Sequence, residues 1–300
     1  MRLPAWLSQH LAALRALLVL TVLTGVLYPL VVTAVAQLPG LRDKADGSLV
    51  TVGDKTVGSA IIGQLFTDKD RNPLNEYFQT RPSAAGDGYD PTATAASNLG
   101  PESVVDTLPD PALVAAGKTD DNAKQSLLTQ VCSRSAAVGK LEGVDGSRPY
   151  CTADGVGAVL GVFHREGNTG PVTQVVSLDQ ACPATPFLTT YQGVAVRCAQ
   201  FGVDYSRAVV TPIRGDAPAT PAVPADAVTA SGSGLDPAIS PAYAQLQAPR
   251  VAKARGITVD TVLKMVEAHT TGRALGFLGA PAVNVVELNL DLDRAYPIHG

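Results

Sequence analysis

Residues Ala16–Ala36 read ALLVLTVLTGVLYPLVVTAVA, a run of 21 residues without a charged side chain. An α-helix rises about 1.5 Å per residue, so a helix of this length covers roughly 30 Å, the thickness of the hydrocarbon core of a bilayer. Gly25 and Pro29 would weaken a helix in water, but membrane helices tolerate both residues. The run is also apolar on every side, unlike a surface helix of a soluble protein. The sequence therefore predicts one transmembrane helix, Ala16–Ala36, after a short N-terminal flank, residues 1–15.

A cleaved signal peptide is the main alternative interpretation of this run. Ala34-Val35-Ala36 resembles the small-residue signature of a cleavage site. The apolar core of a signal peptide usually has about 7–15 residues, and this run is considerably longer. We therefore expect an uncleaved anchor.

The charges beside the predicted span indicate its orientation only slightly. Arg2 and Arg15 precede the span, and Arg42 and Lys44 follow it, so the excess of positive charge on either side is small. The cysteines are more informative, because all of them follow the span. We expect a short cytoplasmic N-terminus and an extracytoplasmic C-terminal domain, with the protein in the plasma membrane.

Four cysteines lie close together in the chain, and an even number in an exported segment is typical of disulfides. They are Cys132, Cys151, Cys182 and Cys198. No Cys-x-x-Cys pair and no histidine at zinc-binding spacing occurs near them, so no metal site is expected. Three pairings are possible, and we favour the sequential one, Cys132–Cys151 and Cys182–Cys198. Closing each of these loops should stabilise the fold by about 3 kcal/mol in the chain-entropy model. Four free thiols in a cytosolic domain are the alternative.

The composition favours a loop-rich α+β domain after the anchor. The chain has 28 glycines, 22 prolines and 46% hydrophobic residues. Its net charge is −4, and its lysines and arginines are scattered and form no basic cluster. Nucleic acid is therefore not an expected partner. We divide the remainder into a first part of the soluble domain at 37–112, an insertion at 113–225, a second part at 226–293 and a tail at 294–300. The insertion ends in a Pro/Ala linker and is expected to be rich in β-structure and to carry the disulfides.

Several elements of the soluble domain are predicted from local signals. A helix is expected at 123–141, with Asp121 or Asn122 as its cap. Ser240-Pro241 and Gly256 are typical of a helix start and stop, and a second helix should run from Thr258 to Gly272. The alternation of leucines and polar residues over 286–292 predicts a strand.

Signatures of catalysis are absent from the sequence. It contains no G-x-S-x-G, no H-E-x-x-H and no phosphate-binding G-x-x-x-x-G-K-[ST] motif. Ser231-Gly232-Ser233-Gly234 could form a nest of N–H groups that binds an anion, although an ordinary loop explains it as well. An anchored extracytoplasmic hydrolase or binding protein with its site in the insertion, using His164, is the alternative function.

Five blocks of sequence resemble the C subunit of the bacterial Kdp potassium-transporting ATPase. They are the anchor with Tyr28-Pro29; Gly58–Gln64 with Phe66; Tyr77-Phe78 with Arg81–Ala84; Tyr89-Asp90-Pro91 with Ser97–Pro101; and a C-terminal run that includes Val228–Pro237, His269-Thr270 and Gly272-Arg273. The resemblance covers about residues 10–112 and 226–293. The long middle segment departs from the family, whose members join the two halves by a short, mainly helical stretch.

The resemblance implies a non-catalytic subunit of a high-affinity, ATP-driven potassium import pump. Its partners would be a channel-like potassium-translocating subunit, a P-type ATPase subunit and a small peptide subunit. The family is described as a catalytic chaperone that raises the ATP affinity of the ATPase subunit, so no tightly bound cofactor is expected and ATP would act through that subunit. Candidate nucleotide-binding or subunit-contact residues are Ser231, Gly232, Ser233, Gly234 and Asp236. Candidate subunit contacts are Arg81, Ser83, Tyr89, Asn98, His269 and Arg273.

Overall fold

A computed structural model describes residues 4–93 and 97–298. The chain forms two compact units, which divide between Ile61 and Ile62. Each unit is described by itself.

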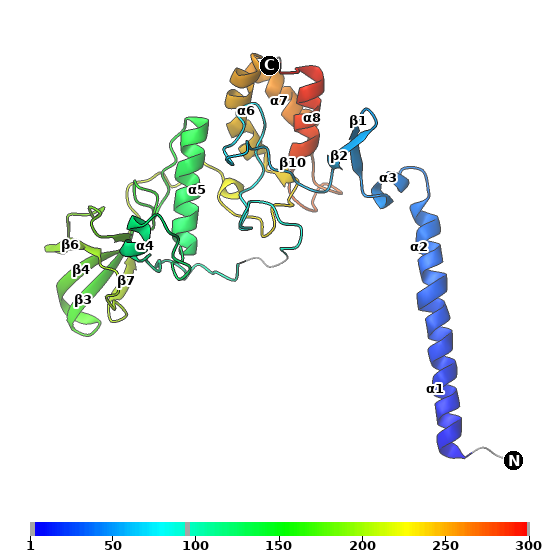
Figure 1. Cartoon of the computed structure of the whole chain (residues 1–300), viewed down its shortest axis with the longest axis horizontal. Coiled ribbons are helices and arrows are strands. Elements are labelled where there is room, and N and C mark those ends of the chain that lie inside the picture. The colour runs from blue at the N-terminus through cyan, green and yellow to red at the C-terminus, as the bar shows by residue number, and fades with distance from the viewer. Residues whose placement is uncertain (1–3, 94–96, 299–300) are drawn as a thin grey trace. The chain divides into compact units, whose positions relative to one another are not determined.

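The N-terminal unit begins with a continuous apolar helix (Figure 1), formed by α1 (Ala5–Val22), η1 (Leu23–Leu27) and α2 (Tyr28–Ala36). It starts before the predicted span and has 32 residues, none of them buried within the protein. Among the described residues it is the one helix long and apolar enough to cross a membrane. The predicted span Ala16–Ala36 lies entirely inside it.

The middle of this helix widens into the π-helical turn η1, which contains Gly25. Pro29 follows four residues later and has no N–H, so the carbonyl of Gly25 lacks its usual helical donor. A π-turn accommodates such a residue without ending the helix. The helix therefore continues past Pro29.

A short helix and a hairpin complete the N-terminal unit. They are α3 (Arg42–Ala45), β1 (Leu49–Val52) and β2 (Lys55–Ser59), with the two strands antiparallel. Val52 faces Lys55 across the turn, where Gly53 has a φ of 58°. Ser59 Oγ donates to the carbonyl of Gly47, 2.6 Å away, and closes the hairpin base.

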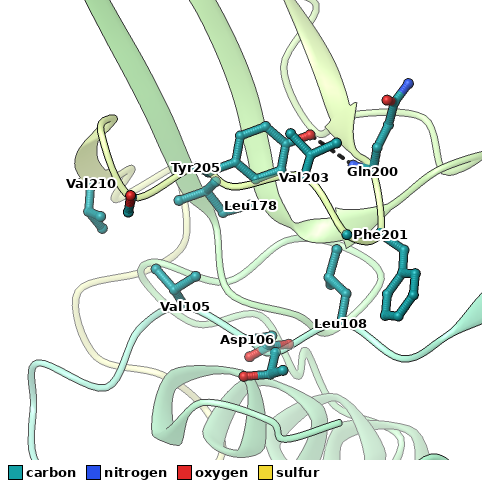
Figure 2. Close-up of a pocket in the computed structure, with 12 residues that line it drawn as sticks. Val105, Asp106, Leu108, Leu178, Gln200, Phe201, Val203, Tyr205 and Val210 are labelled. Atoms are coloured by element: carbon teal, nitrogen blue, oxygen red, sulfur yellow. Dashed lines mark hydrogen bonds between the residues drawn. The ribbon is translucent and has the colours of Figure 1, made fainter. Parts of the chain in front are cut away.

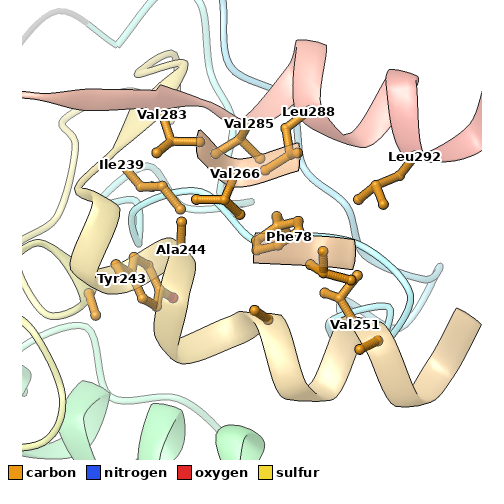
Figure 3. Packing of buried hydrophobic residues seen from close by; sticks show 14 of the residues in the cluster. Phe78, Ile239, Tyr243, Ala244, Val251, Val266, Val283, Val285, Leu288 and Leu292 are labelled. Atoms are coloured by element: carbon orange, nitrogen blue, oxygen red, sulfur yellow. The ribbon is translucent and has the colours of Figure 1, made fainter. Parts of the chain in front are cut away.

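The C-terminal unit has its larger core around Phe78 and three helices (Figure 3). The helices are α6 (Pro241–Arg255), α7 (Val259–Ala268) and α8 (Val285–Ala295), and the sheet beside them has the order β8 (Ala238–Ile239), β10 (Ala282–Asn284), β9 (Thr270–Thr271). The side chain of Ser240 caps α6 and Gly256 ends it with a φ of 65°, as predicted. Thr258 caps α7, which ends at Ala268, earlier than the predicted Gly272.

The strand predicted over 286–292 is wrong, because this segment is helix α8. Asn284 caps it by accepting a hydrogen bond from the N–H of Glu287 at 3.1 Å. Its buried residues include Val285, Leu288 and Leu292, which follow a helical spacing. The alternation of leucines and polar residues suggested a strand instead, because it placed Asn289 on the polar face. In the helix, Asn289 faces the core.

The other part of the C-terminal unit, which we call the disulfide module, is a helix beside a five-stranded sheet. It contains α5 (Leu127–Glu142), β3 (Val159–Glu166), β4 (Thr169–Ala181), β5 (Thr190–Tyr191), β6 (Val194–Ala199) and β7 (Val209–Pro212). The sheet order is β5-β6-β4-β3-β7, with β4 and β6 parallel and the other pairs antiparallel. Separate apolar clusters involve residues that alternate along β3 and β4. Short helices α4 (Pro111–Ala115) and η2 (Ala225–Ala227) flank the module in the chain.

The cysteines form the bridges Cys132–Cys151 and Cys182–Cys198, the sequential pairing. The first joins α5 to the loop before β3, and the second joins β6 to the end of β4. Helix α5 begins later than predicted, because Ser126 rather than Asp121 or Asn122 is its cap. The boundaries of the insertion at 113 and 225 stay predictions.

Candidate functional site

The Gly/Ser segment 231–236 lies against the loop 82–90. The N–H of Ser231 donates to Pro82 O at 2.7 Å, and Ser231 O accepts from the N–H of Ala84 at 2.8 Å. Further along, Ser233 O accepts from the N–H of Asp90 at 2.8 Å. The two segments are far apart in sequence, so these bonds join two distant stretches of the C-terminal unit.

Several N–H groups of this segment already have acceptors inside the fold. Gly234 N–H donates to Ser231 Oγ at 3.1 Å, and Leu235 N–H donates to Ser233 Oγ at 3.3 Å. These groups are satisfied without an external anion. In the folded chain, the segment forms a joint with the loop 82–90.

Gly234 fits this joint because a side chain would not. Its φ is 80°, and a Cβ atom there would collide with the carbonyl oxygen of Gly88. A Cβ at Gly63 would lie 2.5 Å from the carbonyl oxygen of Asp236. Both glycines allow two stretches of backbone to approach closely.

Arg81 and Asp236, two of the predicted site residues, pair with each other. Arg81 Nη1 lies 3.0 Å from Asp236 Oδ2, and its Nε and Nη2 donate to the carbonyl of Thr229 at 3.1 and 3.0 Å. Ser83 accepts the N–H of Ala85 through its Oγ at 3.0 Å. Arg81 and Ser83 thus contribute to the same joint.

The remaining candidates lie apart from one another. Tyr89 is half-buried beside the joint, and Asn98 is exposed. His269 follows the last residue of α7, and its Nε2 lies 3.0 Å from Asp291 Oδ2. Asp291 Oδ1 accepts from Arg294 Nη1 at 3.1 Å. These last three residues link α7 to the outer side of α8.

Residues 272–280, which we call the apolar loop, follow His269 and Thr270. Arg273 lies in it, and every residue of the loop is exposed. Leu275, Phe277 and Leu278 are 83%, 68% and 50% exposed. Such a group of large apolar side chains on a surface is typical of a site that contacts another molecule.

The backbone holds the apolar loop in a tight turn. Ala274 and Leu278 pair in a β-bridge, with N–H to O distances of 2.9 Å in both directions. Leu275, Gly276 and Gly279 have φ values of 53°, 81° and 80°. The turn therefore presents its apolar side chains without further folding, which lowers the entropy cost of binding.

Arg273 was a predicted contact residue, but the exposed apolar side chains after it were not predicted. The signal was the sequence Leu275-Gly276-Phe277-Leu278 between Gly272 and Gly279. Glycines mark a turn, and a turn at the surface exposes whatever apolar residues it carries.

A cleft of about 580 Å³ lies between residues 105–108 and the disulfide module (Figure 2). Its lining is mostly apolar, with Phe201 and Val203 at one side, and Tyr205 Oη accepts the N–H of Gln200 at 2.9 Å. Asp106 lies in the cleft, but its Oδ1 accepts the N–H of Ser126 at 2.7 Å. The nucleophile and base needed for hydrolysis are not assembled in this described lining.

His164, the base of the hydrolase alternative, lies outside that cleft. Its Nδ1 is 2.8 Å from the carbonyl oxygen of Gly170, in the hairpin between β3 and β4. A hydrogen bond to backbone is typical of a packing histidine. Within residues 4–93 and 97–298, no group of three or more His, Cys, Asp or Glu side chains could hold a metal ion.

Together these features define a class: a membrane-associated α+β protein whose most distinctive described surface is suited to contact with another molecule. The family model for "K+-transporting ATPase, c chain" matches residues 10–130 and 203–294. The chain belongs to this family. It is an accessory subunit of a potassium pump.

Curated relatives match nearly the whole chain. A "Potassium-transporting ATPase KdpC subunit" of Mycobacterium tuberculosis (strain ATCC 25618 / H37Rv) is 36% identical over 286 residues, covering 95% of this chain and 98% of the relative. The protein of the same name from Kineococcus radiotolerans is 38% identical over 291 residues, or 97% and 96%. The one from Beijerinckia indica subsp. indica is 35% identical with the same coverage.

The middle of the disulfide module differs from the rest of the chain in these comparisons. The family model leaves residues 131–202 unmatched, whereas the relatives cover almost the full length. The middle segment is therefore not peculiar to this chain, although the family model does not match it.

Proposed function

We propose that the C-terminal unit docks on the potassium-translocating subunit of the pump through the apolar loop. The carrying observation is the exposure of Leu275, Phe277 and Leu278 on a turn with a fixed backbone. An apolar pocket on the partner would remove these side chains from water, at about 25 cal/mol per Å² of buried apolar surface. Aromatic anchors that fill pockets commonly dominate the affinity of such interfaces.

The Gly/Ser segment is a less suitable target for testing this proposal. Its hydrogen bonds to Pro82, Ala84 and Asp90 join two parts of the fold. Deletion of the segment would damage the domain as well as any docking surface. Substitutions in the apolar loop leave the cores untouched, because its side chains are exposed.

Leu275→Ser with Phe277→Ser should reduce assembly of the pump by about tenfold or more, because both side chains are expected anchors of the interface. The measurement is recovery of the other pump subunits with the tagged variant from detergent-solubilised membranes, together with potassium-limited growth. The variant should reach the membrane at the wild-type level, since the loop contributes nothing to the cores.

Phe201→Ser with Val203→Ser is the matched control. These side chains are 49% and 48% exposed, on the cleft of the disulfide module, and their loss should leave assembly unchanged. A fully assembled, active pump with the apolar-loop variant would contradict the proposed docking surface.

We also propose that the C-terminal unit lies outside the cell, in agreement with its two disulfides. Asp87→Cys, at a position 96% exposed, should react with a membrane-impermeant maleimide in intact cells. Gln9→Cys, before the predicted span, should react only after permeabilisation. The four native cysteines are bridged and do not compete. The reverse labelling pattern would refute this orientation.

The effect on ATP affinity that the family resemblance implies would then be indirect. A domain outside the cell does not meet cytoplasmic ATP. It can change the ATP affinity of the ATPase subunit only by binding two states of the pump with different affinities. The apolar loop would supply this difference in affinity if its binding site on the pump were accessible to different extents in the two states.

A further inference from the structure

A second cleft, of about 630 Å³, lies between α5 and the chain segment 72–82. We call it the α5 cleft. Ala137, Val138 and Leu141 line it from α5, and Pro73 and Pro82 line it from the segment opposite. Its volume is in the range of clefts that bind small organic molecules, about 300–1,000 Å³.

One cation in this cleft lacks a counter-ion. Arg134 is half-buried, and it donates to the neutral acceptors Val228 O at 3.1 Å and Gln130 Oε1 at 3.0 Å. No carboxylate lies within ion-pair distance of it in the described part of the chain. Burial lowers the pKa of the Arg134 guanidinium.

A hydroxyl group in the same lining also lacks a partner. Tyr243 is only 3% exposed and lines the α5 cleft, and no hydrogen bond of its hydroxyl occurs among the described residues. Burial raises the pKa of Tyr243, so the hydroxyl stays protonated and can donate. A ligand in the cleft that offers an acceptor would therefore give this hydroxyl a partner.

The charged side chains that line the cleft are positive, although the charges of Glu142 and Asp226 act on Tyr243 from nearby. Lys140 lines it in addition to Arg134, and no Asp or Glu belongs to the described lining. Glu142 is nearby but is paired with Arg250 at 3.0 Å. Asp226 accepts the N–H and hydroxyl of Ser240 at 2.7 and 2.8 Å.

We propose that the α5 cleft binds a small amphipathic carboxylate. The carboxylate group would accept hydrogen bonds from Arg134 and Tyr243, and an aryl or short alkyl body would lie against the apolar face of α5. This site is independent of the apolar loop and of the proposed docking. It lies where the disulfide module meets the family-like domain, so a bound ligand would stiffen that junction.

Calorimetric titration of the full chain in lipid nanodiscs tests the proposal, with empty nanodiscs as the blank. The probe is 4-phenylbutyrate, compared with 4-phenylbutanol and 4-phenylbutylamine, which share its apolar body. The carboxylate should bind at least about tenfold more tightly than either analogue, because charge-assisted hydrogen bonds distinguish it. Equal affinities for the three compounds, or no binding of 4-phenylbutyrate at millimolar concentration, would overturn the proposal.

Variants test the two polar residues separately. Arg134→Gln should weaken 4-phenylbutyrate binding by about tenfold, and Tyr243→Phe by about threefold or more. Arg165→Gln, which removes an exposed arginine of the β3–β4 hairpin, should change nothing. Unchanged binding by Arg134→Gln would refute the site. If that variant does not fold, the comparison of the three compounds on the wild-type chain decides the question.

Discussion

Arg250→Met should lower the free energy of unfolding of the C-terminal unit by about 3–5 kcal/mol, the usual cost of removing one partner of a buried ion pair. Arg250 Nε lies 3.0 Å from Glu142 Oε1, and the two side chains are 8% and 0% exposed. The variant leaves the carboxylate of Glu142 buried without its cation. Urea unfolding, followed by circular dichroism, measures the loss.

The same arginine also binds the backbone of a distant segment. Its Nη1 donates to the carbonyls of Leu74, Asn75 and Tyr77 at 3.3, 2.7 and 3.0 Å, and its Nη2 donates to Gln247 Oε1 at 2.9 Å. One side chain on α6 therefore fixes both the end of α5 and the chain that leads to Phe78. Methionine can fill the space but supplies none of these donors.

Two further variants separate the ion pair from the general loss of a long side chain. Lys253→Met changes an exposed residue of the same helix and should cost little. Adding Glu142→Gln to Arg250→Met should restore part of the lost stability, because it removes the unpaired charge. Equal losses for Arg250→Met and Lys253→Met would contradict the importance of the buried pair.

Local signals were sufficient to predict several elements of this fold. The membrane span Ala16–Ala36 was predicted from the length and hydropathy of the uncharged run alone. The start and stop of α6 were visible in Ser240-Pro241 and Gly256, because a capping side chain and a left-handed glycine act within a few residues. The sequential disulfide pairing joins cysteines that are close in the chain.

Features that depend on distant residues could not be predicted in the same way. Asn289 is buried on α8 because its Oδ1 accepts the N–H of Phe78 at 2.8 Å and its Nδ2 donates to Phe78 O at 2.9 Å. This partner is 211 residues away. From the sequence alone, the asparagine was therefore placed on the polar face of a strand. The same limit applies to Arg81. The sequence made it a candidate contact with another subunit, but it did not reveal the ion pair with the distant Asp236.

A buried carboxyl group in the disulfide module was also not apparent from the sequence. Asp179, on β4, is 5% exposed. Its Oδ1 accepts the N–H of Asp106 at 2.9 Å, and its Oδ2 has no hydrogen-bond partner among the described residues. A Cβ at position 157 would collide with Asp179 Oδ2, so a larger residue there would force this carboxyl group to shift. Burial raises the pKa of Asp179 to about 8; the hydrogen bond from Asp106 opposes this shift, and the charge of Asp106 adds to it.

This raised pKa predicts that the stability of the module falls with rising pH. In the unfolded chain an aspartate has a pKa of about 3.9, so between about pH 4 and about pH 8 the unfolded state releases a proton that the folded state keeps. The contribution of Asp179 to stability is complete below about pH 4 and is lost by about pH 8. Through this group alone, the free energy of unfolding can fall by up to about 1.4 kcal/mol per pH unit.

Asp179→Asn should remove this dependence and make the chain more stable than the wild type at about pH 8, because the amide cannot ionise and its oxygen can still accept the Asp106 N–H. The advantage should shrink steadily toward about pH 5, and urea midpoints across this range measure it. Asp204→Asn is the control: its exposed carboxylate accepts the N–H of Ser206 at 2.8 Å, and hydrogen bonds from Ser206 lower its pKa. Its loss should therefore produce no gain at high pH. A constant difference between wild type and Asp179→Asn at every pH would show that Asp179 does not titrate in this range, and that its burial is compensated by groups other than the Asp106 N–H.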